Sequence, residues 1–254
     1  MTRSHDTVVQ DQFGPRADAY ARSAVHAGGE DLDALSRIVA DHAPAHALDL
    51  GCGGGHVTYR LARHAARVTA VDLSADMLAA VTRGAGERGL ANVATRAAAA
   101  EDLPFADGAF DFLACRFSAH HWRDFEAGLR QARRVLRPGS TAVFIDVVSP
   151  GPAALDTHLQ AVELLRDPSH VRDYAAAEWL AALTRAGFAP GRARARRLRM
   201  DYPVWIERMR APETHQAAIR SIQSGVSREI AAHFEIEPDG SFTIDTAEFE
   251  VTAA

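Results

Sequence analysis

The sequence of 254 residues contains no lysine, so all 28 of its basic residues are arginine. Without lysine the chain cannot form a Schiff base, cannot bind phosphate as a P-loop does, and cannot supply the tyrosine–lysine pair of many reductases. This absence excludes several classes of enzyme chemistry before any motif is considered.

Cysteine and long apolar runs are also scarce. The two cysteines, Cys52 and Cys115, form no C-x-x-C pair and have no Cys/His spacing typical of structural zinc. No segment approaches the roughly 18 apolar residues of a membrane span, and the first residues lack the apolar core of a signal peptide. We therefore expect a reduced, cytoplasmic protein with no metal site and no stable membrane insertion.

The net charge of −5 gives no reason to expect a polyanionic partner. Arginines alternate with smaller residues over 191–202, which is the pattern of a strand with one solvated face. No aromatic residues that could stack on bases interleave with them, so no nucleic-acid partner is expected.

Predicted strands and helices alternate through the first part of the chain. Short apolar segments typical of buried strands occupy 46–50, 67–73, 92–97, 110–115 and 141–148, and amphipathic helices occupy 31–42, 57–64, 74–89 and 125–136. Strands that are apolar throughout and alternate with helices indicate an α/β, doubly wound, mostly parallel sheet with helices on both faces. In such sheets ligands bind outside the carboxyl ends of the strands.

The pattern changes after Ser149. Helices are expected over 155–166 and 175–187, a strand over 191–202 and a helical region over 204–233. Residues 234–251 then predict a closing hairpin with a Pro-Asp-Gly turn.

The glycine-rich turn in LDLGCGGGHV, residues 48–57, predicts a close approach of the backbone to a nucleotide-like ligand. A dinucleotide site has a third glycine where this chain has His56, and an anionic Asp49 at the mouth of the turn would repel a pyrophosphate. A cationic sulfonium nucleoside with an ammonium group is compatible with both residues. Asp72, 21 residues after Gly51, suits ribose hydroxyls in either kind of ligand.

Four segments in this order resemble the class I S-adenosylmethionine-dependent methyltransferases, in particular the type-11 group with the ubiquinone/menaquinone C-methyltransferases. They are LDLGCGGG, VTAVDLSADML, AEDLPFADGAFDFLACRFSAHHW and ARRVLRPGS. The resemblance implies a Rossmann-like sheet of seven strands with an antiparallel C-terminal strand and a helical cap. It also implies one domain over 1–254, with an N-terminal lid over 1–30, a cofactor-binding core over 31–149 and cap helices with closing strands over 150–254.

The resemblance implies S-adenosylmethionine as cofactor and S-adenosylhomocysteine as product. By this resemblance, the methionine half of the cofactor lies near the glycine turn and the Arg116 carbonyl. Asp72 bonds to the ribose, and Leu73 and Met77 pack on the adenine. The implied cofactor-binding set is Tyr20, Asp49, Gly51, Cys52, Gly53, Asp72, Leu73, Met77, Ala100, Glu101, Arg116 and Phe117. Met77 and Tyr20 are also compatible with core positions. One departure is Ala99, which stands where relatives have an aspartate that contacts the adenine amino group, so weaker cofactor binding or a substitute contact is expected.

Two adjacent histidines, His120 and His121, follow the fourth predicted strand and suit a general base, because histidine titrates near neutrality. Either of them could instead bond to the backbone or shape the acceptor pocket. His170, Arg172 and Tyr174 offer further acceptor contacts, in a segment that also has the composition of a solvated loop.

The expected acceptor is a small molecule bound under a cap built from 150–185 and 200–235, methylated on carbon or oxygen. Homodimerisation is a further possible feature. Two alternatives stay open: an NAD-dependent dehydrogenase, and a catalytically silent protein that binds S-adenosylmethionine as the partner of another enzyme.

Overall fold

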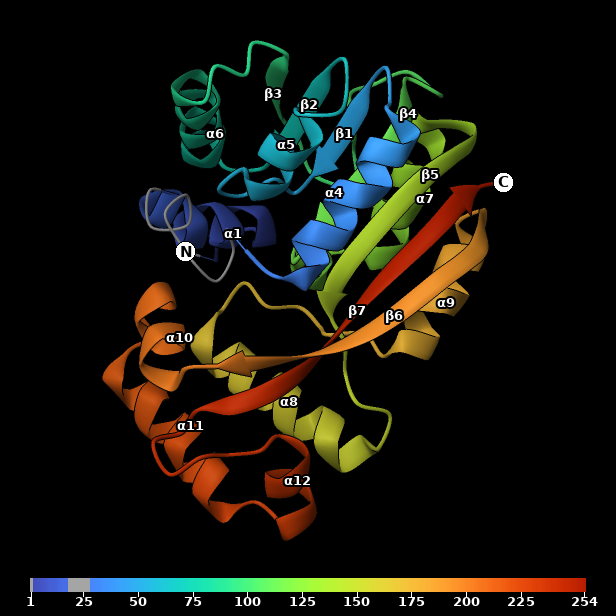
Figure 1. The fold of residues 1–254 in the computed structure, drawn as a ribbon. Helices are drawn as coiled ribbons and strands as arrows, with labels where there is room; N and C mark the ends of the chain where they lie inside the picture. Colours follow the sequence, from blue (N-terminus) through green and yellow to red (C-terminus); the bar gives the residue numbers. More distant parts are fainter. Residues whose placement is uncertain (1, 18–27) are drawn as a thin grey trace.

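The computed structural model describes residues 2–17 and 28–254. Figure 1 shows a twisted sheet flanked by helices, with further helices gathered at one end. The strands are β1 (Ala47–Leu50), β2 (Val68–Asp72), β3 (Val93–Ala97), β4 (Phe110–Arg116), β5 (Leu136–Val147), β6 (Phe188–Met200) and β7 (Phe242–Ala253). The described helices are α1 (His5–Phe13), η1 (Gly14–Arg16), α4 (Glu30–His42), α5 (His56–Leu61), α6 (Ala75–Glu87), η2 (Ala119–His121), α7 (Phe125–Val135), α8 (Ala153–Arg166), α9 (Ala176–Arg185), α10 (Tyr202–Met209), α11 (Glu213–Gly225) and α12 (Arg228–His233).

The seven strands form one sheet in the order β3-β2-β1-β4-β5-β7-β6. The first five are parallel, with Asp49 of β1 between Ala70 of β2 and Ala114 of β4. Strand β7 runs antiparallel between β5 and β6. The doubly wound fold with an antiparallel C-terminal strand, predicted from the alternation and the resemblance, is confirmed.

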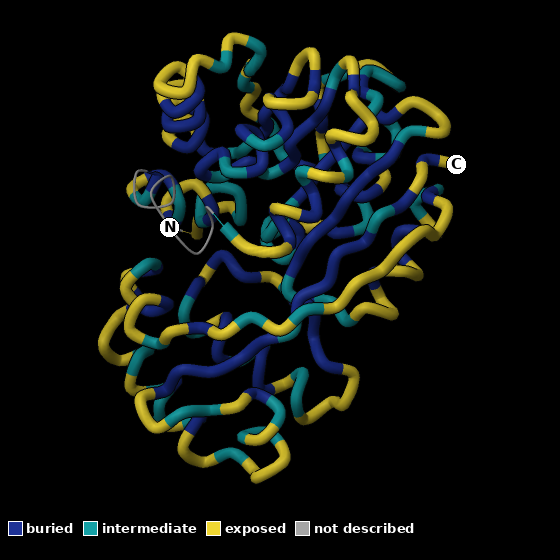
Figure 2. The backbone as a smooth tube through the Cα atoms, viewed as in Figure 1, coloured by how far each residue is buried: buried dark blue, intermediate teal, exposed yellow. Residues whose placement is uncertain are grey.

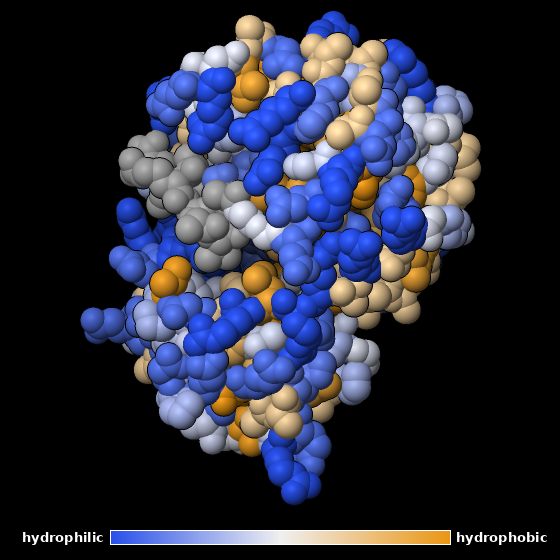
Figure 3. All heavy atoms as spheres, in the orientation of Figure 1, coloured by the Kyte–Doolittle hydropathy of each residue, from blue (hydrophilic) through white to orange (hydrophobic). Residues whose placement is uncertain are grey.

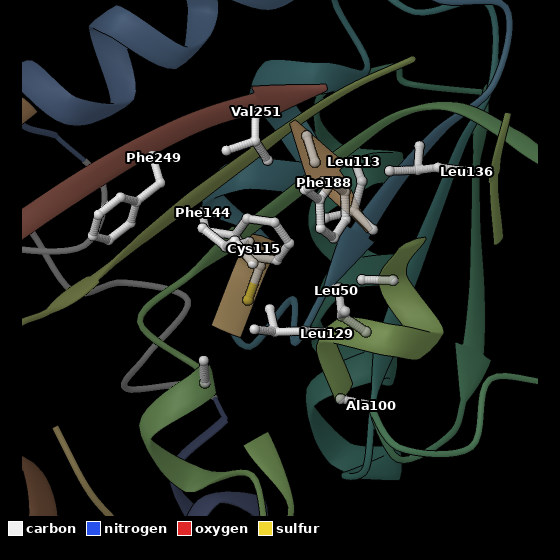
Figure 4. Close-up of a cluster of buried hydrophobic side chains, with 14 of the residues drawn as sticks. Leu50, Ala100, Leu113, Cys115, Leu129, Leu136, Phe144, Phe188, Phe249 and Val251 are labelled. Carbon is white, nitrogen blue, oxygen red and sulfur yellow. The ribbon is translucent and has the colours of Figure 1, made fainter. Parts of the chain in front are cut away.

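Both faces of the sheet are covered, which is why the central strands are apolar throughout. On one face, α4 and α5 bury leucine and valine side chains against β1, β4 and β5. On the other, α7 and α9 pack against Leu113, Phe144 and Phe249 (Figure 4), and Trp179 of α9 stacks on Phe249. This packing holds the strand ends at the edge where the loops after β1, β2 and β4 meet.

A second apolar cluster lies under the helices of the last hundred residues. Helices α8, α10, α11 and α12 gather at one end of the sheet (Figure 1), where buried backbone is flanked by exposed turns (Figure 2). Trp205, Phe234 and Phe242 belong to the apolar cluster of this group and are all buried. The extended ends of β6 and β7 reach into this group and connect it to the sheet. Most of the expected cap, 150–185 and 200–235, belongs to this group, but α9 lies within the first of these ranges and packs on the sheet instead.

The predicted C-terminal hairpin over 234–251 is wrong. Residues 234–241 make turns after α12, and β7 pairs with β6 over eleven registered positions from Phe188↔Ala253 to Met200↔Phe242. Three helices intervene between the two strands. Because the Pro-Asp-Gly signal is local, it located a turn but could not reveal a partner forty residues away.

Strand β6 forms one edge of the sheet and is largely exposed. Its arginines bond to acidic residues beside them, as in the pairs Arg196–Glu248 and Arg199–Glu237. Charged side chains on an edge strand oppose pairing with another chain. Figure 3 shows a mostly hydrophilic face with hydrophobic groups in small separate areas. Among the described residues, no helix has both the length and the apolar character needed to cross a membrane.

Candidate functional site

The glycine turn follows β1 directly and lies at the carboxyl edge of the sheet. Gly51 has φ +74°, and a Cβ atom there would lie 2.0 Å from the Ser118 hydroxyl oxygen, so this glycine allows the loop after β4 to approach. Gly53 has φ +47° and faces open space, with no atom within 4 Å of an added Cβ. The two glycines thus serve different purposes: one admits a neighbouring loop and the other leaves room above the turn.

A pocket of about 1020 Å³, measured with its open mouth, lies over this turn. It is walled by the loops after β1, β2 and β4, by Ala98, Ala100 and Glu101, and by α1. Its wall combines apolar side chains with a few polar groups, as the sites of small ligands do. Most of the predicted site residues lie in its wall: Gly51, Cys52, Gly53, Asp72, Leu73, Met77, Ala100, Glu101, Arg116, Phe117 and His121.

Asp72 presents its carboxylate to the pocket at the end of β2. Its two oxygens accept hydrogen bonds from the backbone N–H groups of Gly53 and Ser74, each at 2.9 Å. Burial raises the pKa of Asp72, and these hydrogen bonds oppose the rise. Each oxygen keeps lone-pair capacity, so the group can accept hydrogen bonds from vicinal hydroxyls of a ligand.

Asp49 lies beneath the turn, so its expected place at the mouth is wrong. Because side chains alternate along a strand, Leu50 faces the pocket and Asp49 points to the opposite side of the sheet. The Thr58 hydroxyl donates to its Oδ2 at 2.5 Å, and Oδ1 has no partner among the described residues. Burial raises the pKa of Asp49 to about 7. A cation on the other side of the turn would compensate this buried charge.

Arg116 lies in the pocket wall at the end of β4, and its side chain is paired with a residue outside this wall. The guanidinium bonds to Asp31 of α4 at 2.5 Å and lies over the Phe117 ring. Phe117 adopts φ +51°, a conformation that is uncommon outside glycine. The chain turns sharply there, so the end of β4 lies beside the glycine turn.

The two histidines of η2 occupy different positions. His121 lines the pocket, whereas His120 lies behind it with Nδ1 2.6 Å from a carboxylate oxygen of Asp146, at the end of β5. Burial alone would lower the pKa of His120, but the charge of Asp146 and this hydrogen bond raise it to about 9. Burial and the neighbouring His120 lower the pKa of His121 to about 4.

The segment 167–174 is packed between η2 and α8 rather than solvated. Ser169 and Asp173 are buried, and the His170 ring bonds to Gln160 of α8. Arg172 bonds to acidic side chains, and Tyr174 stacks on Phe125. His170, Arg172 and Tyr174 lie outside the pocket wall.

Helix α1 forms the outer wall of the pocket, a role that the sequence interpretation assigned only generally to a lid. His5, Asp6, Val9 and Phe13 face the pocket, and the His5 ring bonds to the backbone carbonyl of His121 at 2.8 Å. Ser4, which caps α1, and the following apolar spacing were the available signals for this helix. Tyr20 lies outside the described residues.

Comparison with known proteins places this geometry in a family. Residues 48–144 match the model of a methyltransferase domain. The chain is 31% identical over 207 residues to the uncharacterized methyltransferase YcgJ of Bacillus subtilis, covering 82% of each chain. It belongs to the class I S-adenosylmethionine-dependent methyltransferases.

Further relatives agree with this membership. The methyltransferase is 44% identical over 195 residues to the uncharacterized Escherichia coli protein YafE, covering 77% of this chain and 94% of the relative. It is 33% identical over 181 residues to a ubiquinone biosynthesis O-methyltransferase of Xanthomonas oryzae, with 69% and 72% covered. The crystal structure of YcgJ superposes with a TM-score of 0.82, covering 87% of the methyltransferase and 97% of YcgJ at 28% identity.

Proposed function

We propose that the chain binds S-adenosylmethionine in this pocket and transfers its methyl group to a small-molecule acceptor, releasing S-adenosylhomocysteine. The observation that carries the proposal is the pair of carboxylates around the glycine turn: Asp72 in the wall, and Asp49 behind it with an oxygen that has no partner in the described part of the chain. A nucleoside with a cationic amino-acid tail satisfies both groups. A dinucleotide would place its diphosphate beside them.

The proposed contacts follow the pocket wall. Asp72 accepts from the ribose hydroxyls, Leu73 and Met77 pack on the adenine, and the backbone of Ala100 and Glu101 meets its edge. Gly51, Cys52, Gly53 and Phe117 surround the methionine portion, and the Arg116 carbonyl accepts from its ammonium group. Ala99 bonds through its carbonyl to the N–H of Asp102 and lies outside the wall, so it offers no side-chain replacement for the missing adenine contact.

When bound, the cofactor supplies a methyl group already activated by positive sulfur. The protein's part is therefore to position, exclude water and accept a proton. Helix α1 covers the pocket from outside and bonds at Gln10 to the Leu73 carbonyl and at His5 to the His121 carbonyl. Both contacts reach loops that hold the cofactor, so α1 closes the site over it.

We propose that the acceptor enters beside η2, under the cap. Methylation on oxygen or on carbon is compatible with the family, and the Xanthomonas relative is named for O-methylation in ubiquinone biosynthesis. We keep the division into a lid (1–30), a cofactor core (31–149) and a cap with closing strands (150–254). The cytoplasmic location and the homodimer stay predictions.

Calorimetric titration of the purified chain with S-adenosylmethionine tests the proposal. Asp72→Ala should weaken binding by about 2–5 kcal/mol, the range of one to two charge-assisted hydrogen bonds. Asp72→Asn, which keeps the size of the side chain, should weaken it less. Asp107→Ala is the matched control, because that side chain is 81% exposed and is not part of the pocket wall. Equal affinity in the wild type and Asp72→Ala would remove Asp72 from the site.

A further inference from the structure

Each histidine of η2 is held through its Nδ1 atom, one by a carboxylate directly and the other through a serine that bonds to a second carboxylate. His120 Nδ1 bonds directly to Asp146, whose other oxygen accepts from the Ala119 N–H. His121 Nδ1 lies 3.2 Å from the Ser169 carbonyl and 3.3 Å from the Ser169 hydroxyl. That hydroxyl donates in turn to buried Asp167 at 2.6 Å.

These contacts determine the tautomer of His121. A carbonyl oxygen only accepts, and the Ser169 hydroxyl already gives its proton to Asp167, so both contacts require a proton on His121 Nδ1. In the neutral ring the lone pair is then on Nε2. No described residue bonds to this nitrogen, and the ring belongs to the pocket wall.

The charge of the neighbouring ring keeps His121 neutral. The His120 and His121 rings lie 4.1 Å apart, and His120 carries the proton that Asp146 stabilises. Two nearby carboxylates, Asp167 and Asp146, favour protonation of the His121 ring. Two further histidines are close: the His5 ring bonds to the His121 backbone carbonyl, and the His170 ring lies 5.9 Å from the His120 ring. Burial and His120 outweigh the two carboxylates, since the pKa of His121 is about 4.

Building on the proposed function, we propose that His121 Nε2 accepts the proton of an acidic hydroxyl, a phenol or an enol, on the methyl acceptor, and that His120 and Asp146 are its positioning residues. The hydroxyl proton passes to Nε2 while the acceptor oxygen forms its bond to the methyl carbon. The carbon–sulfur bond breaks with its electron pair on sulfur, which leaves a neutral thioether and a histidinium.

The surrounding charge explains the choice of hydroxyl. An oxygen that loses its proton develops negative charge next to protonated His120, which stabilises that charge. An ammonium acceptor would meet the same positive group and be repelled. The charge of His120 opposes protonation of the His121 imidazole, so His121 is a weak base. An ordinary alcohol is too weakly acidic to give its proton to such a base, and the more acidic hydroxyls of phenols and enols fit best.

Histidine NMR on the full chain loaded with S-adenosylhomocysteine tests the positioning role directly. His121 should be the Nδ1–H tautomer and neutral from pH 5 to 8. His120→Gln removes a unit charge about 4 Å away and should raise the pKa of His121 by about 1–3 units. Asp146→Asn would lower the pKa of His120 but would also remove a carboxylate that raises the pKa of His121, so its two effects oppose each other. His120→Asn removes the same charge as His120→Gln and is the second variant if the first does not fold. A His121 that titrates at pH 6 or above in the wild type, or a pKa unchanged in both variants, would overturn the proposal.

Methyl transfer to small probes tests the acceptor class. With 4-methoxyphenol, whose hydroxyl is protonated at pH 7, and S-adenosylmethionine we expect formation of S-adenosylhomocysteine, with no transfer to 4-methoxyaniline. His121→Gln should reduce transfer at least 100-fold while the affinity for S-adenosylmethionine stays within twofold. His64→Gln, an exposed histidine outside the pocket, is the matched control.

The outcomes separate the two proposals. Transfer to the aniline in preference to the phenol, or to neither, overturns the hydroxyl assignment although the cofactor binds. A chain that does not bind S-adenosylmethionine instead contradicts the proposed function itself.

Discussion

Replacement of Asp49 by asparagine probes a carboxyl whose ionisation the fold opposes. The side chain is completely buried, Thr58 is its one hydrogen-bonding side-chain partner in the described part of the chain, and burial raises its pKa from the ordinary 3.8 to about 7. One pKa unit corresponds to about 1.4 kcal/mol. The ionised group therefore costs the folded protein about 4 kcal/mol at pH 7 and above.

The sign of the pH dependence follows from this shift. The pKa of Asp49 is higher in the folded chain than in the unfolded chain, so this residue lowers the free energy of unfolding only where it ionises. The folded protein keeps the full contribution of Asp49 to stability below pH 3.8 and loses it progressively as the pH rises to about 7. Relative to Asp49→Asn, the wild type should lose about 1.4 kcal/mol per pH unit in this window and nothing further above it. An amide nitrogen buried without a partner costs about 1–3 kcal/mol, so the variant should be more stable by about 1–3 kcal/mol at pH 8.

Urea unfolding followed by tryptophan fluorescence, without cofactor and at steps from pH 4 to 8, measures this difference. The variant Asp107→Asn, altered at an exposed aspartate, should parallel the wild type. Curves for the wild type and Asp49→Asn that keep a constant separation over the whole pH range would refute the reasoning, because they would mean that Asp49 does not titrate there.

Three other outcomes are expected. Calorimetry at pH 7 in buffers of different ionisation enthalpy should detect proton release when S-adenosylmethionine binds the wild type, and none with Asp49→Asn; equal release in both would separate Asp49 from the cofactor. Gly128→Ala should destabilise by about 1–3 kcal/mol in thermal unfolding, since its Cβ would lie 2.3 Å from the Trp122 ring. Gly86→Ala, also helical but with no atom within 4 Å, should instead stabilise by up to about 1 kcal/mol, and a loss there would contradict the packing argument. Trp179→Ala should cost about 3–5 kcal/mol in urea unfolding, because the indole is buried between α9 and the sheet; a loss under 1 kcal/mol would show that the site collapses.

Local patterns were sufficient for the core of the fold. The apolar strands and the glycine turn lie where their spacing predicted, and α6 begins after Ser74, whose hydroxyl accepts from the Met77 N–H. These features depend on residues close in sequence. The carboxyl-edge rule for parallel sheets then brought Asp72, Arg116 and His121 to one pocket.

Long-range features were beyond these patterns. The partner of β7 is β6, which no turn signal could indicate across three helices. Asp49 was assigned to the mouth although strand alternation, applied to Leu50, would have placed it on the opposite side. The division of roles between His120 and His121 depends on Asp146 and Ser169, which are distant in sequence and meet only in the folded chain.

Parallel calorimetric titrations of the unmodified chain with S-adenosylmethionine and with NAD test the central claim most directly. The account predicts saturable one-to-one binding of S-adenosylmethionine, competition by S-adenosylhomocysteine, and no binding of NAD at the same concentrations. Binding of NAD in preference to S-adenosylmethionine, or no heat and no thermal stabilisation with S-adenosylmethionine, would contradict it.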